Sequence, residues 1–376
     1  MKFLIFSNYL PSVLHLRGNL LQSISLLGYE VHILSPNPSQ YPNEYNRLTE
    51  LGFNIHPIIL NRTSTNPIDD LRTLYSAYKV MNEIKPDVVL SYTIKPVIYG
   101  TLAAWLSGVP KRFALLAGLG YSFQDSEKKT LIKKITYNLY KEGLAKTTKV
   151  FFQNPDDLDL LKKMRVIGTE TPYVIVNGSG VDTKQYNVSY FPKDEYGNIK
   201  PSFLLIARLL KDKGINEYIS AAKIVRKKYP EAEFHLVGWI DENPEAITKN
   251  QLDDWVSSGI VNYWGKLNDV RPAITASSVY VLPSYREGTP RSVLEAMSMG
   301  RAIITTDAPG CRETVNEGEN GYLVPVKDSQ KLAEAMLKFI KNPVLYKNMG
   351  DASRKIAESK YDVHKVNTHM ISEMEL

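Results

Sequence analysis

Two carboxylates lie near one expected helix start, where they can accept hydrogen bonds from sugar or ribose hydroxyls. Glu287 precedes a helix that we expect to begin at Pro290 with Thr289 as its N-cap, and Glu295 lies about a turn and a half inside it. Amides at a helix start bind anions, and carboxylates beside them accept hydrogen bonds from hydroxyl groups. A purely structural alternative stays open, because Glu287 suits the helix dipole and Glu295 is spaced to pair with Arg291.

Two basic side chains in an earlier loop have the chemistry to hold a diphosphate. Arg208 and Lys213 lie in the stretch 207–214, between a strand that we expect to end at Ile206 and the next helix. An arginine offers a planar fork of donors and a lysine offers a mobile point charge, and both suit phosphate oxygens. The alternative is a loop of solvated charges.

These loops must be positioned by short apolar runs that alternate with helical periodicity along nearly the whole chain. This alternation indicates doubly wound α/β architecture with parallel sheets, and the near-continuous apolar runs indicate strands covered on both faces. In the first series we expect strands at Lys2–Phe6, Glu30–Ser35, Asn54–Ile59, Asp87–Ser91, Arg112–Ala117 and Lys149–Gln153. In the second series we expect them at Ser202–Ile206, Glu233–Val237, Ile260–Trp264, Val279–Leu282, Ala302–Thr306 and Gly321–Val324.

The stretch 182–201 separates the two series and is the best candidate for a domain boundary. It is rich in Tyr, Asn, Lys and Pro and lacks clear periodicity. We therefore expect one Rossmann-like domain over residues 1–183, a second over residues 184–360, and a last helix over residues 361–376. Ligands of open parallel sheets bind beyond the carboxyl ends of the strands, which is where the charged loops fall.

The composition is that of a soluble globular protein. Hydrophobic residues make up 43% and charged residues 23% of the 376 residues, a length that suits two domains. The net charge of +6 suits an anionic ligand or surface, and we expect no nucleic-acid partner because basic and aromatic residues form no such motif. Cys311 is the only cysteine, so we expect neither a disulfide nor a thiolate metal cage. With no signal peptide or transmembrane run expected, a cytoplasmic location is the default.

The segment around the two carboxylates is similar to a known signature. Glu287, seven intervening residues and Glu295 are followed by Ala296, Met297, Gly300 and Thr305. An arginine followed five residues later by Lys-Gly, here Arg208 and Lys213-Gly214, belongs to the same pattern. On these motifs the sequence resembles glycosyltransferase family 4, whose members are retaining enzymes of the GT-B fold. In that fold two Rossmann-like domains face one cleft, and the last helix crosses back onto the first domain.

This resemblance implies a role for each charged side chain. Glu287 would grip hydroxyls of the donor sugar, Glu295 would bind the ribose hydroxyls, and Arg208 and Lys213 would hold the diphosphate of the donor. We therefore expect Glu287, Arg208 and Lys213 to carry catalysis. Further donor contacts are expected at the helix start and at neighbouring strand ends, namely Gly238, Lys266, Leu267, Gly288, Thr289 and Arg291.

Loops of the first domain are expected to contact the acceptor or the donor phosphates. The expected contacts are Arg17 and Gly18 after the first strand, and Gly118 and Gly120 after the fifth. Many family members carry a histidine around the latter loop, and because this sequence has none, no side chain is assigned as a base. The Gly-Leu-Gly-Tyr form of the loop resembles a subgroup that makes bacterial surface polysaccharides or lipid-linked oligosaccharides. That subgroup implies a UDP sugar of the galactose or N-acetylgalactosamine type.

A basic amphipathic helix is expected from Glu127 to Lys149. Six lysines between Lys128 and Lys146 accompany an apolar side formed by residues such as Leu131, Ile135 and Leu139. Such a helix can lie on an anionic membrane surface, and a lipid-linked acceptor would favour that contact at the inner face of the cell membrane. A solvated face above an ordinary core stripe is the alternative.

The triplet Asp157-Leu158-Asp159 has the D-x-D form that binds a metal in another large glycosyltransferase fold. The preceding Asn154-Pro155 predicts a helix start, where acidic residues are favourable without any metal. A single-sheet metal-dependent fold would also leave the second α/β series unexplained. We therefore expect no metal site and no cofactor, with the nucleotide sugar acting as co-substrate.

The sequence thus predicts a retaining, metal-independent hexosyltransferase. It would move a hexose or N-acetylhexosamine from a nucleotide diphosphate sugar to a hydroxyl of a glycan or of a polyprenyl-diphosphate-linked saccharide. A nucleotide-sugar epimerase of the same fold is the alternative within enzymes. A non-catalytic nucleotide-sugar-binding subunit of a biosynthetic complex is the alternative outside them.

Overall fold

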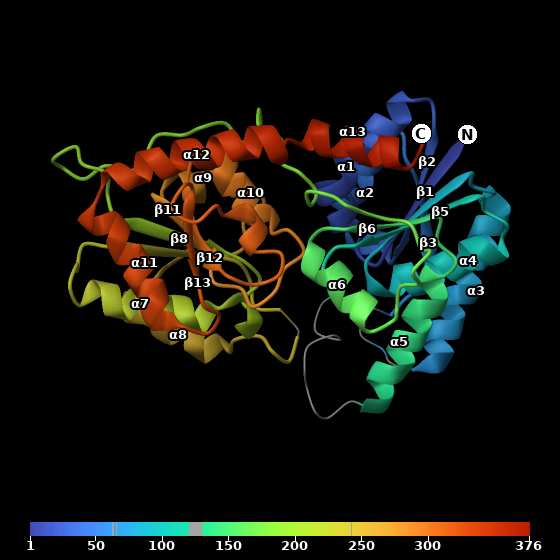
Figure 1. The fold of residues 1–376 in the computed structure, drawn as a ribbon, viewed down its shortest axis with the longest axis horizontal. Coiled ribbons are helices and arrows are strands. Elements are labelled where there is room, and N and C mark those ends of the chain that lie inside the picture. Colours follow the sequence, from blue (N-terminus) through green and yellow to red (C-terminus); the bar gives the residue numbers. More distant parts are fainter. Residues whose placement is uncertain (62–63, 65, 120–129, 242) are drawn as a thin grey trace. The chain divides into compact units, whose positions relative to one another are not determined.

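The chain divides into two units, each built on its own parallel sheet (Figure 1). The computed structural model describes residues 1–61, 64, 66–119, 130–241 and 243–376, with the backbone alone for residues 130–134 and 136. Unit 1 comprises Met1–Ser179 and His364–Leu376, and unit 2 comprises Gly180–Val363. The sequence had placed this division a few residues later, between residues 183 and 184.

Unit 1 contains a seven-stranded parallel sheet in the order β3-β2-β1-β4-β5-β6-β7. Its strands are β1 (Lys2–Ser7), β2 (Glu30–Pro36), β3 (Asn54–Ile58), β4 (Val88–Tyr92), β5 (Lys111–Leu116), β6 (Lys149–Phe152) and β7 (Tyr173–Ile175). Its helices are α1 (Leu10–Leu26), α2 (Pro42–Glu50), α3 (Pro67–Ile84), α4 (Thr101–Leu106), α5 (Thr130–Leu144), α6 (Pro155–Lys163) and α13 (Val363–Glu373). Short turns η1 (Pro38–Gln40, a 3-10 helix) and η2 (Pro96–Gly100, a π-helix) complete the unit.

Unit 2 contains a six-stranded parallel sheet in the order β10-β9-β8-β11-β12-β13. Its strands are β8 (Ser202–Ile206), β9 (Glu233–Val237), β10 (Asn262–Tyr263), β11 (Val279–Leu282), β12 (Ala302–Thr306) and β13 (Gly321–Val324). Its helices are α7 (Ile215–Arg226), α8 (Lys249–Ser257), α9 (Arg271–Thr275), α10 (Arg291–Ser298), α11 (Ser329–Lys341) and α12 (Val344–Lys360). The 3-10 turns are η4 (Lys211–Lys213) and η5 (Arg312–Thr314).

In each sheet the chain order reverses beside the first strand of the unit. The sheet of unit 2 places β9 on one side of β8 and β11 on the other, and the sheet of unit 1 repeats this with β2, β1 and β4. The loops that leave two such strands diverge to opposite faces, which opens a crevice at their carboxyl ends. The loops after β8 and β11 therefore flank the place where a ligand of unit 2 would bind.

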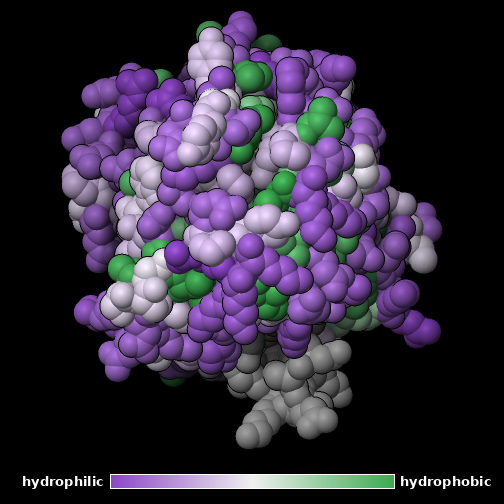
Figure 2. Space-filling view, turned by 90° about the vertical axis from the view of Figure 1, so that its left-hand side faces the viewer, coloured by the Kyte–Doolittle hydropathy of each residue, from purple (hydrophilic) through white to green (hydrophobic). Residues whose placement is uncertain are grey.

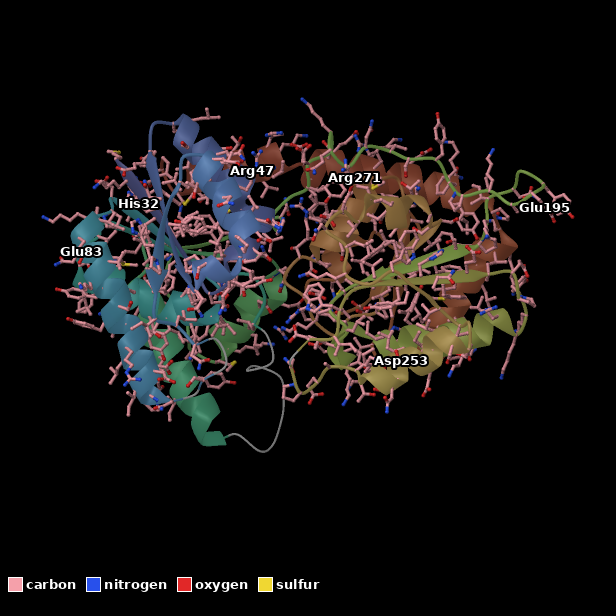
Figure 3. The ribbon with its side chains drawn as sticks, turned by 180° about the vertical axis from the view of Figure 1, so that it is seen from behind. His32, Arg47, Glu83, Glu195, Asp253 and Arg271 are labelled. Carbon is pink, nitrogen blue, oxygen red and sulfur yellow. The ribbon has the colours of Figure 1, made fainter. Side chains whose placement is uncertain are left out.

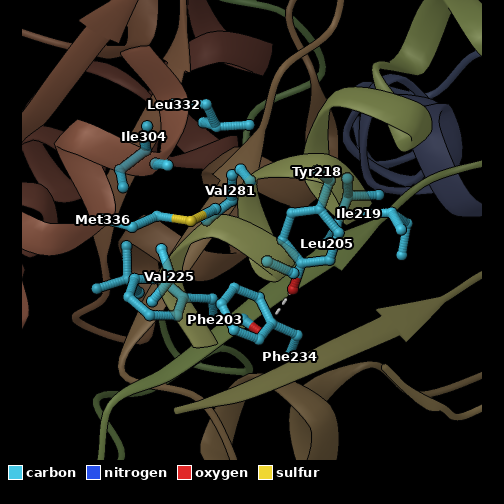
Figure 4. Close-up of a cluster of buried hydrophobic side chains, with 14 of the residues drawn as sticks. Phe203, Leu205, Tyr218, Ile219, Val225, Phe234, Val281, Ile304, Leu332 and Met336 are labelled. Carbon is cyan, nitrogen blue, oxygen red and sulfur yellow. Dashed lines mark hydrogen bonds between the residues drawn. The ribbon is translucent and has the colours of Figure 1, made fainter. Parts of the chain in front are cut away.

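The core of unit 2 fixes the strands that carry these loops. Phe203, Leu205, Phe234 and Val281 are buried on one face of the sheet beneath α7 and α11 (Figure 4). Tyr218 on α7 is fully buried among them, and its hydroxyl donates to the carbonyl oxygen of Phe203 at 2.8 Å. That hydrogen bond joins α7 to β8, the two elements that flank the loop after β8. The apolar packing around Tyr218 keeps both ends of this loop in place.

The α/β fold class predicted from the sequence is confirmed, as are all twelve predicted strands to within a few residues at their ends. The basic helix differs from the prediction, because α5 ends at Leu144 and Lys149 opens β6; residues 127–129 lie outside the described residues. The last helix, α13, belongs to unit 1, where Val366, Met370 and Met374 are buried in the core. Its apolar stripe explains this position.

The molecular face in Figure 2 is mainly hydrophilic, with small hydrophobic spots scattered among the polar residues. Scattered apolar residues of this kind are normal on a face in contact with water. Within the described parts of the chain, no helix combines the length and the apolar character that crossing a membrane requires.

Candidate functional site

Unit 2 collects most of the predicted site residues at the carboxyl ends of its strands. Arg208 and Lys213 follow β8, Gly238 follows β9, and Lys266 with Leu267 follows β10. Glu287, Gly288, Thr289, Arg291 and Glu295 follow β11, in the loop and first turns of α10. Because β8 and β11 are neighbours in the sheet, the two charged loops lie on either side of the reversal in strand order.

The loops at this edge pack backbone against backbone, and glycines make this possible. A Cβ atom on Gly214, which ends the β8 loop, would overlap the carbonyl group of Pro283 in the β11 loop. A Cβ atom on Gly310, after β12, would overlap the carbonyl oxygens of Glu287 and Gly288. The amide of Glu287 also donates to the carbonyl oxygen of Pro309 at 2.9 Å. The backbone around Glu287 is therefore held from two sides.

The first turn of α10 begins one residue later than the sequence predicted. Pro290, rather than Thr289, is the N-cap, with extended backbone angles, and α10 starts at Arg291. The fixed φ of proline suits either position, so the sequence pattern could not separate the two. At the other end, Gly300 has a φ of +76° directly after the C-cap Met299, so the predicted helix stop is confirmed.

Glu287 is bound by a cation and a hydroxyl within unit 2. The ammonium group of Lys213 donates to Glu287 Oε1 at 2.6 Å, and Ser284 Oγ donates to the same oxygen at 2.6 Å. The side chains of Lys213 and Glu287 are only 14% and 16% exposed, so water screens this ion pair weakly. The pair joins Lys213, which was predicted to bind the diphosphate, to Glu287, which was predicted to bind the sugar.

Glu295 is buried and is bound by Arg291, which also contacts residues from outside the motif. Arg291 Nε donates to Glu295 Oε1 at 3.0 Å, and Arg291 Nη1 donates to the carbonyl oxygen of Gly180 at 2.8 Å. The guanidinium carbon of Arg291 also lies 5.9 Å from the ring centre of Tyr186. Sequence reasoning missed Tyr186, because it lies in the aperiodic stretch between the domains and no local pattern links it to α10.

The segment that carries Tyr186 is itself fixed to unit 2. Arg271, the first residue of α9, reaches the carbonyl oxygen of Gln185 at 3.4 Å (Figure 3). Arg301 is fully buried, and its guanidinium donates to the carbonyl oxygens of Ser189 and Tyr190 at 3.0 and 2.9 Å. The stretch predicted as a boundary therefore contributes structure to the second domain.

Two further predicted residues, Arg208 and Lys266, lie on the exposed rim of the same edge. Arg208 Nη1 donates to Asp241 Oδ2 at 3.2 Å, and its side chain is 43% exposed, so the guanidinium is accessible to a ligand. The ammonium group of Lys266 lies 4.9 Å from the ring centre of Trp239, the residue after Gly238. Trp239 is 39% exposed and presents an aromatic surface there.

Cys311 lies beneath this edge as a packed side chain. It is fully buried, and burial, together with the charge of Glu287, raises the pKa of its thiol to about 12. Because the thiolate is the reactive form, such a thiol is a poor nucleophile at neutral pH.

The predicted residues of unit 1 that the structure describes lie in α1 and after β5. Arg17 is 2% exposed in α1, with its guanidinium 5.1 Å from the ring centre of Tyr92 and 3.5 Å from the carbonyl oxygen of Gly178. It is thus packed inside the unit, next to Gly18. Gly118 follows β5 with a φ of +96°. Gly120 lies outside the described residues, so the predicted glycine loop is described only in part.

The D-x-D triplet forms the helix start that the sequence predicted. Asn154 caps α6, its side chain accepting from the amide of Asp157 at 2.8 Å. Asp157 is fully buried, and Asn154 Nδ2 donates to its carboxylate at 3.2 Å. Among the residues that the structure describes, no cluster of three or more His, Cys, Asp or Glu side chains could hold a metal ion.

Comparisons with known protein families match both halves of the chain. The model described as "Glycosyl transferases group 1" matches residues 200–342, and the model described as "Glycosyl transferase 4-like" matches residues 8–154. The matches include the β8 and β11 loops with their charged side chains. The chain therefore belongs to the glycosyltransferases that these two models describe.

Individual relatives and solved structures agree. An N,N'-diacetylbacillosaminyl-diphospho-undecaprenol alpha-1,3-N-acetylgalactosaminyltransferase of Campylobacter jejuni is 28% identical over 348 residues, covering 90% of this chain and 89% of that protein. A UDP-Gal:alpha-D-GlcNAc-diphosphoundecaprenol alpha-1,3-galactosyltransferase of Escherichia coli is 27% identical over 291 residues, covering 74% and 72%. Anabaena HepE, solved in complex with UDP, has a TM-score of 0.76 at 17% identity and full coverage of both chains. The fold is that of the GT-B glycosyltransferases.

Proposed function

We propose that this protein is a retaining glycosyltransferase of family 4 that uses a UDP sugar and needs no metal. The transferred group would be a hexose or N-acetylhexosamine of the galactose or N-acetylgalactosamine type. The acceptor would be a hydroxyl of a glycan or of a polyprenyl-diphosphate-linked saccharide in bacterial surface polysaccharide biosynthesis, such as that of O-antigen or capsule. Two relatives whose names state diphospho-undecaprenol substrates support this acceptor class.

One observation carries the proposal for the donor. Lys213 and Glu287 form a largely buried ion pair between the loops that follow the adjacent strands β8 and β11 of unit 2. Glu295, paired with Arg291, follows β11 as well, and Arg208 follows β8. Parallel sheets bind nucleotides beyond the carboxyl ends of their strands, so cations and hydroxyl acceptors in these two loops support the proposal. Arg208 and Lys213 would stabilise the diphosphate as its charge grows, assisted by the amides of Gly288 and Thr289.

The reaction follows from these assignments. The bond between the anomeric carbon of the sugar and the β-phosphate oxygen breaks, and the acceptor oxygen bonds to that carbon on the same face. The acceptor proton passes to the leaving phosphate of UDP, so no side-chain base is required. Glu287 would hold sugar hydroxyls and Glu295 the ribose diol. Unit 2 would thus bind the donor, and unit 1 the acceptor.

A peripheral location on the inner face of the cell membrane is part of the proposal. Unit 1 contains 21 Lys and Arg residues against 16 Asp and Glu, a net charge of +5, so it carries most of the +6 of the chain. Such an excess favours an anionic lipid surface. We assign the contact to residues 127–149, of which the structure describes residues 130–149.

The test is a transfer assay with UDP-hexoses and UDP-N-acetylhexosamines on a polyprenyl-diphosphate-linked saccharide. Glycosylated lipid with one UDP released per transfer is the expected result. Epimerised donor, or binding without turnover, would contradict it. Glu295→Gln should weaken UDP binding, whereas Glu287→Gln should reduce turnover with less effect on affinity. If both variants keep full activity, the site assignment is wrong.

A further inference from the structure

Unit 1 contains a cavity that the described residues of the predicted site do not line. Its volume is about 590 Å³, a size typical of small-molecule sites. It lies where β2 and β3 end, with walls formed by η1, by α2, by β3 and by Ser76 of α3. Because β3 is at the edge of the sheet, this side of the unit is accessible to a ligand.

The described lining of this cavity is neutral. Three prolines, three isoleucines and Tyr45 supply apolar surface, while Asn37, Ser39, Asn46 and Ser76 supply amides and hydroxyls. All of these polar residues except Ser76 are exposed, as is Tyr45. No Lys, Arg, Asp or Glu is among the described residues that line the cavity. Amides and hydroxyls both donate and accept hydrogen bonds, so the cavity suits a ligand rich in neutral hydroxyl or acetamido groups.

Two of the polar side chains lie on backbone that is fixed by hydrogen bonds. Asn37 has a φ of +44°, a left-handed conformation that asparagine adopts more readily than most residues. Its carbonyl oxygen accepts from the amide of Gln40 at 3.1 Å, which closes the η1 turn. On α3, Ser76 Oγ accepts from the amide of Ile59 at 3.2 Å, and its hydroxyl can still donate to a ligand. These groups are therefore positioned before any ligand binds.

A saccharide fits this lining better than the other parts of a lipid-linked acceptor do. A diphosphate is charged, and the described lining offers it no cation. A prenyl chain would cover the amides and hydroxyls without replacing the hydrogen bonds that they make to water, which costs free energy. A sugar ring offers hydroxyls to these polar groups and an apolar face to Tyr45 and the prolines.

The cavity also adjoins the loop after β1, where contacts to the acceptor were predicted. Tyr41 is the N-cap of α2, and the next residue, Pro42, lines the cavity. The ring of Tyr41 lies edge-on to the ring of Tyr9 at the start of the β1 loop, with ring centres 5.2 Å apart. Because β1 and β2 are parallel neighbours, the β1 loop and the cavity lie at the same edge of the sheet.

We propose that this cavity binds a neutral hexose or N-acetylhexosamine unit of the acceptor saccharide. This rests on the proposed function, because it specifies which part of the acceptor unit 1 holds. Tyr45 would pack against the apolar face of the sugar ring. Asn37 and Asn46 would hydrogen-bond its hydroxyl or acetamido groups and so distinguish one sugar from another.

The first test measures binding of the methyl glycosides of galactose, N-acetylgalactosamine and N-acetylglucosamine to the full chain by ligand-observed NMR. Wild type should bind at least one of them saturably, and Tyr45→Ala and Asn46→Ala should each weaken that binding about fivefold to tenfold. Asn43→Ala is the control for Asn46→Ala, because Asn43 is exposed on α2 outside the cavity lining. Tyr75→Ala, at a residue 69% exposed on α3, is the control for Tyr45→Ala. Both controls should bind as wild type does, and a thermal melt establishes that each variant is folded.

The second test measures the KM for the lipid-linked saccharide in the transfer assay. Tyr45→Ala should raise this KM about fivefold to tenfold and leave kcat and the KM for the UDP sugar near their wild-type values. An unchanged acceptor KM in a wild-type-like transfer reaction would contradict this inference alone.

The remaining outcomes are also decisive. The inference is overturned if wild type binds none of the three glycosides, or if Tyr45→Ala and Asn46→Ala leave their binding unchanged. Binding of a short-chain polyprenyl phosphate that these two variants weaken would identify a lipid cavity instead. Wild-type protein that binds a glycoside in the cavity but transfers sugar from no UDP donor would contradict the proposed function and not the cavity.

Discussion

The ammonium group of Lys213 lies 2.6 Å from a carboxylate oxygen of Glu287, an oxygen that Ser284 also binds. Lys213 comes from the loop after β8 and Glu287 from the loop after β11. Their contact therefore spans the reversal in strand order of unit 2. Under the proposed function it links the two ends of the bond that breaks, since one group would hold the diphosphate and the other the sugar.

Replacing Lys213 by Met should weaken diphosphate binding selectively. A charge-assisted contact to the phosphate would be lost, so UDP affinity should fall about tenfold while UMP affinity changes little. Calorimetric titration with each nucleotide measures both. Lys211→Met is the control, because Lys211 is in the same turn with its side chain 52% exposed. Similar losses in the two variants would remove Lys213 from the donor site.

Gly310→Ala should damage both stability and turnover. The new Cβ would overlap the carbonyl oxygens of Glu287 and Gly288, so that backbone must shift. Gly318 has the same φ of +79° with nothing within 4 Å of its Cβ position, so Gly318→Ala isolates the conformational cost. We expect about 1–2 kcal/mol for Gly318→Ala and about 2 kcal/mol more for Gly310→Ala. Chemical denaturation measures the unfolding free energy of both variants. Equal losses of stability would show that the close approach of Gly310 to the β11 loop is unimportant.

Acidification should destabilise unit 2 through His235. This residue is 5% exposed on β9, and its Nδ1 accepts from the indole of Trp264 at 3.1 Å. Burial lowers the pKa of His235 below its ordinary value of 6.5, the charge of Lys200 adds to this, and that of Glu233 opposes it. Below about pH 6.5 the unfolded chain therefore binds more protons at this histidine than the folded chain does. The contribution of neutral His235 to the unfolding free energy is complete above about pH 6.5 and declines as the pH falls toward the folded-state pKa.

The measurement is the unfolding free energy from pH 7.5 to 5.5. His235→Asn keeps an acceptor near Trp264 but cannot titrate, so its pH dependence should be smaller than that of wild type. The pKa values of His32 and His56 in unit 1 are also lowered by burial, so part of the dependence should remain. Of these two histidines, His32 on β2 is the buried one (Figure 3). If the unfolding free energy of His235→Asn falls with pH as steeply as that of wild type, the prediction is wrong.

Chelation should leave transfer activity intact, and Asp157→Asn should act on stability alone. The carboxylate of Asp157 accepts from Asn154 at 3.2 Å inside the first turn of α6, so the substitution should cost unit 1 about 1 kcal/mol. Initial rates before and after treatment with EDTA, normalised to folded protein, test this. Activity that disappears with EDTA and returns with magnesium would restore a metal role to the D-x-D triplet.

Most of the architecture could be predicted from the sequence because buried parallel strands are apolar on both faces and leave a local mark. Ser202–Ile206 and Ala302–Thr306 were predicted at the bounds that the structure has. The strand Tyr173–Ile175 was missed, because it is three residues long and both end side chains are more than 40% exposed. The N-cap of α10 was misplaced by one residue for a different reason, because a proline fits both the N-cap and the first helical position.

The charged residues that define the site were also readable in the sequence, because loops after strands of a parallel sheet must emerge at one edge. The sequence thus determined which groups gather there, from Arg208 to Glu295. Only the tertiary structure decided how each is held. Lys213 is bound to Glu287, and Arg291 lies beside the ring of Tyr186, which belongs to a stretch without periodicity. Such contacts join segments distant in the chain, and their geometry depends on packing that no local pattern records.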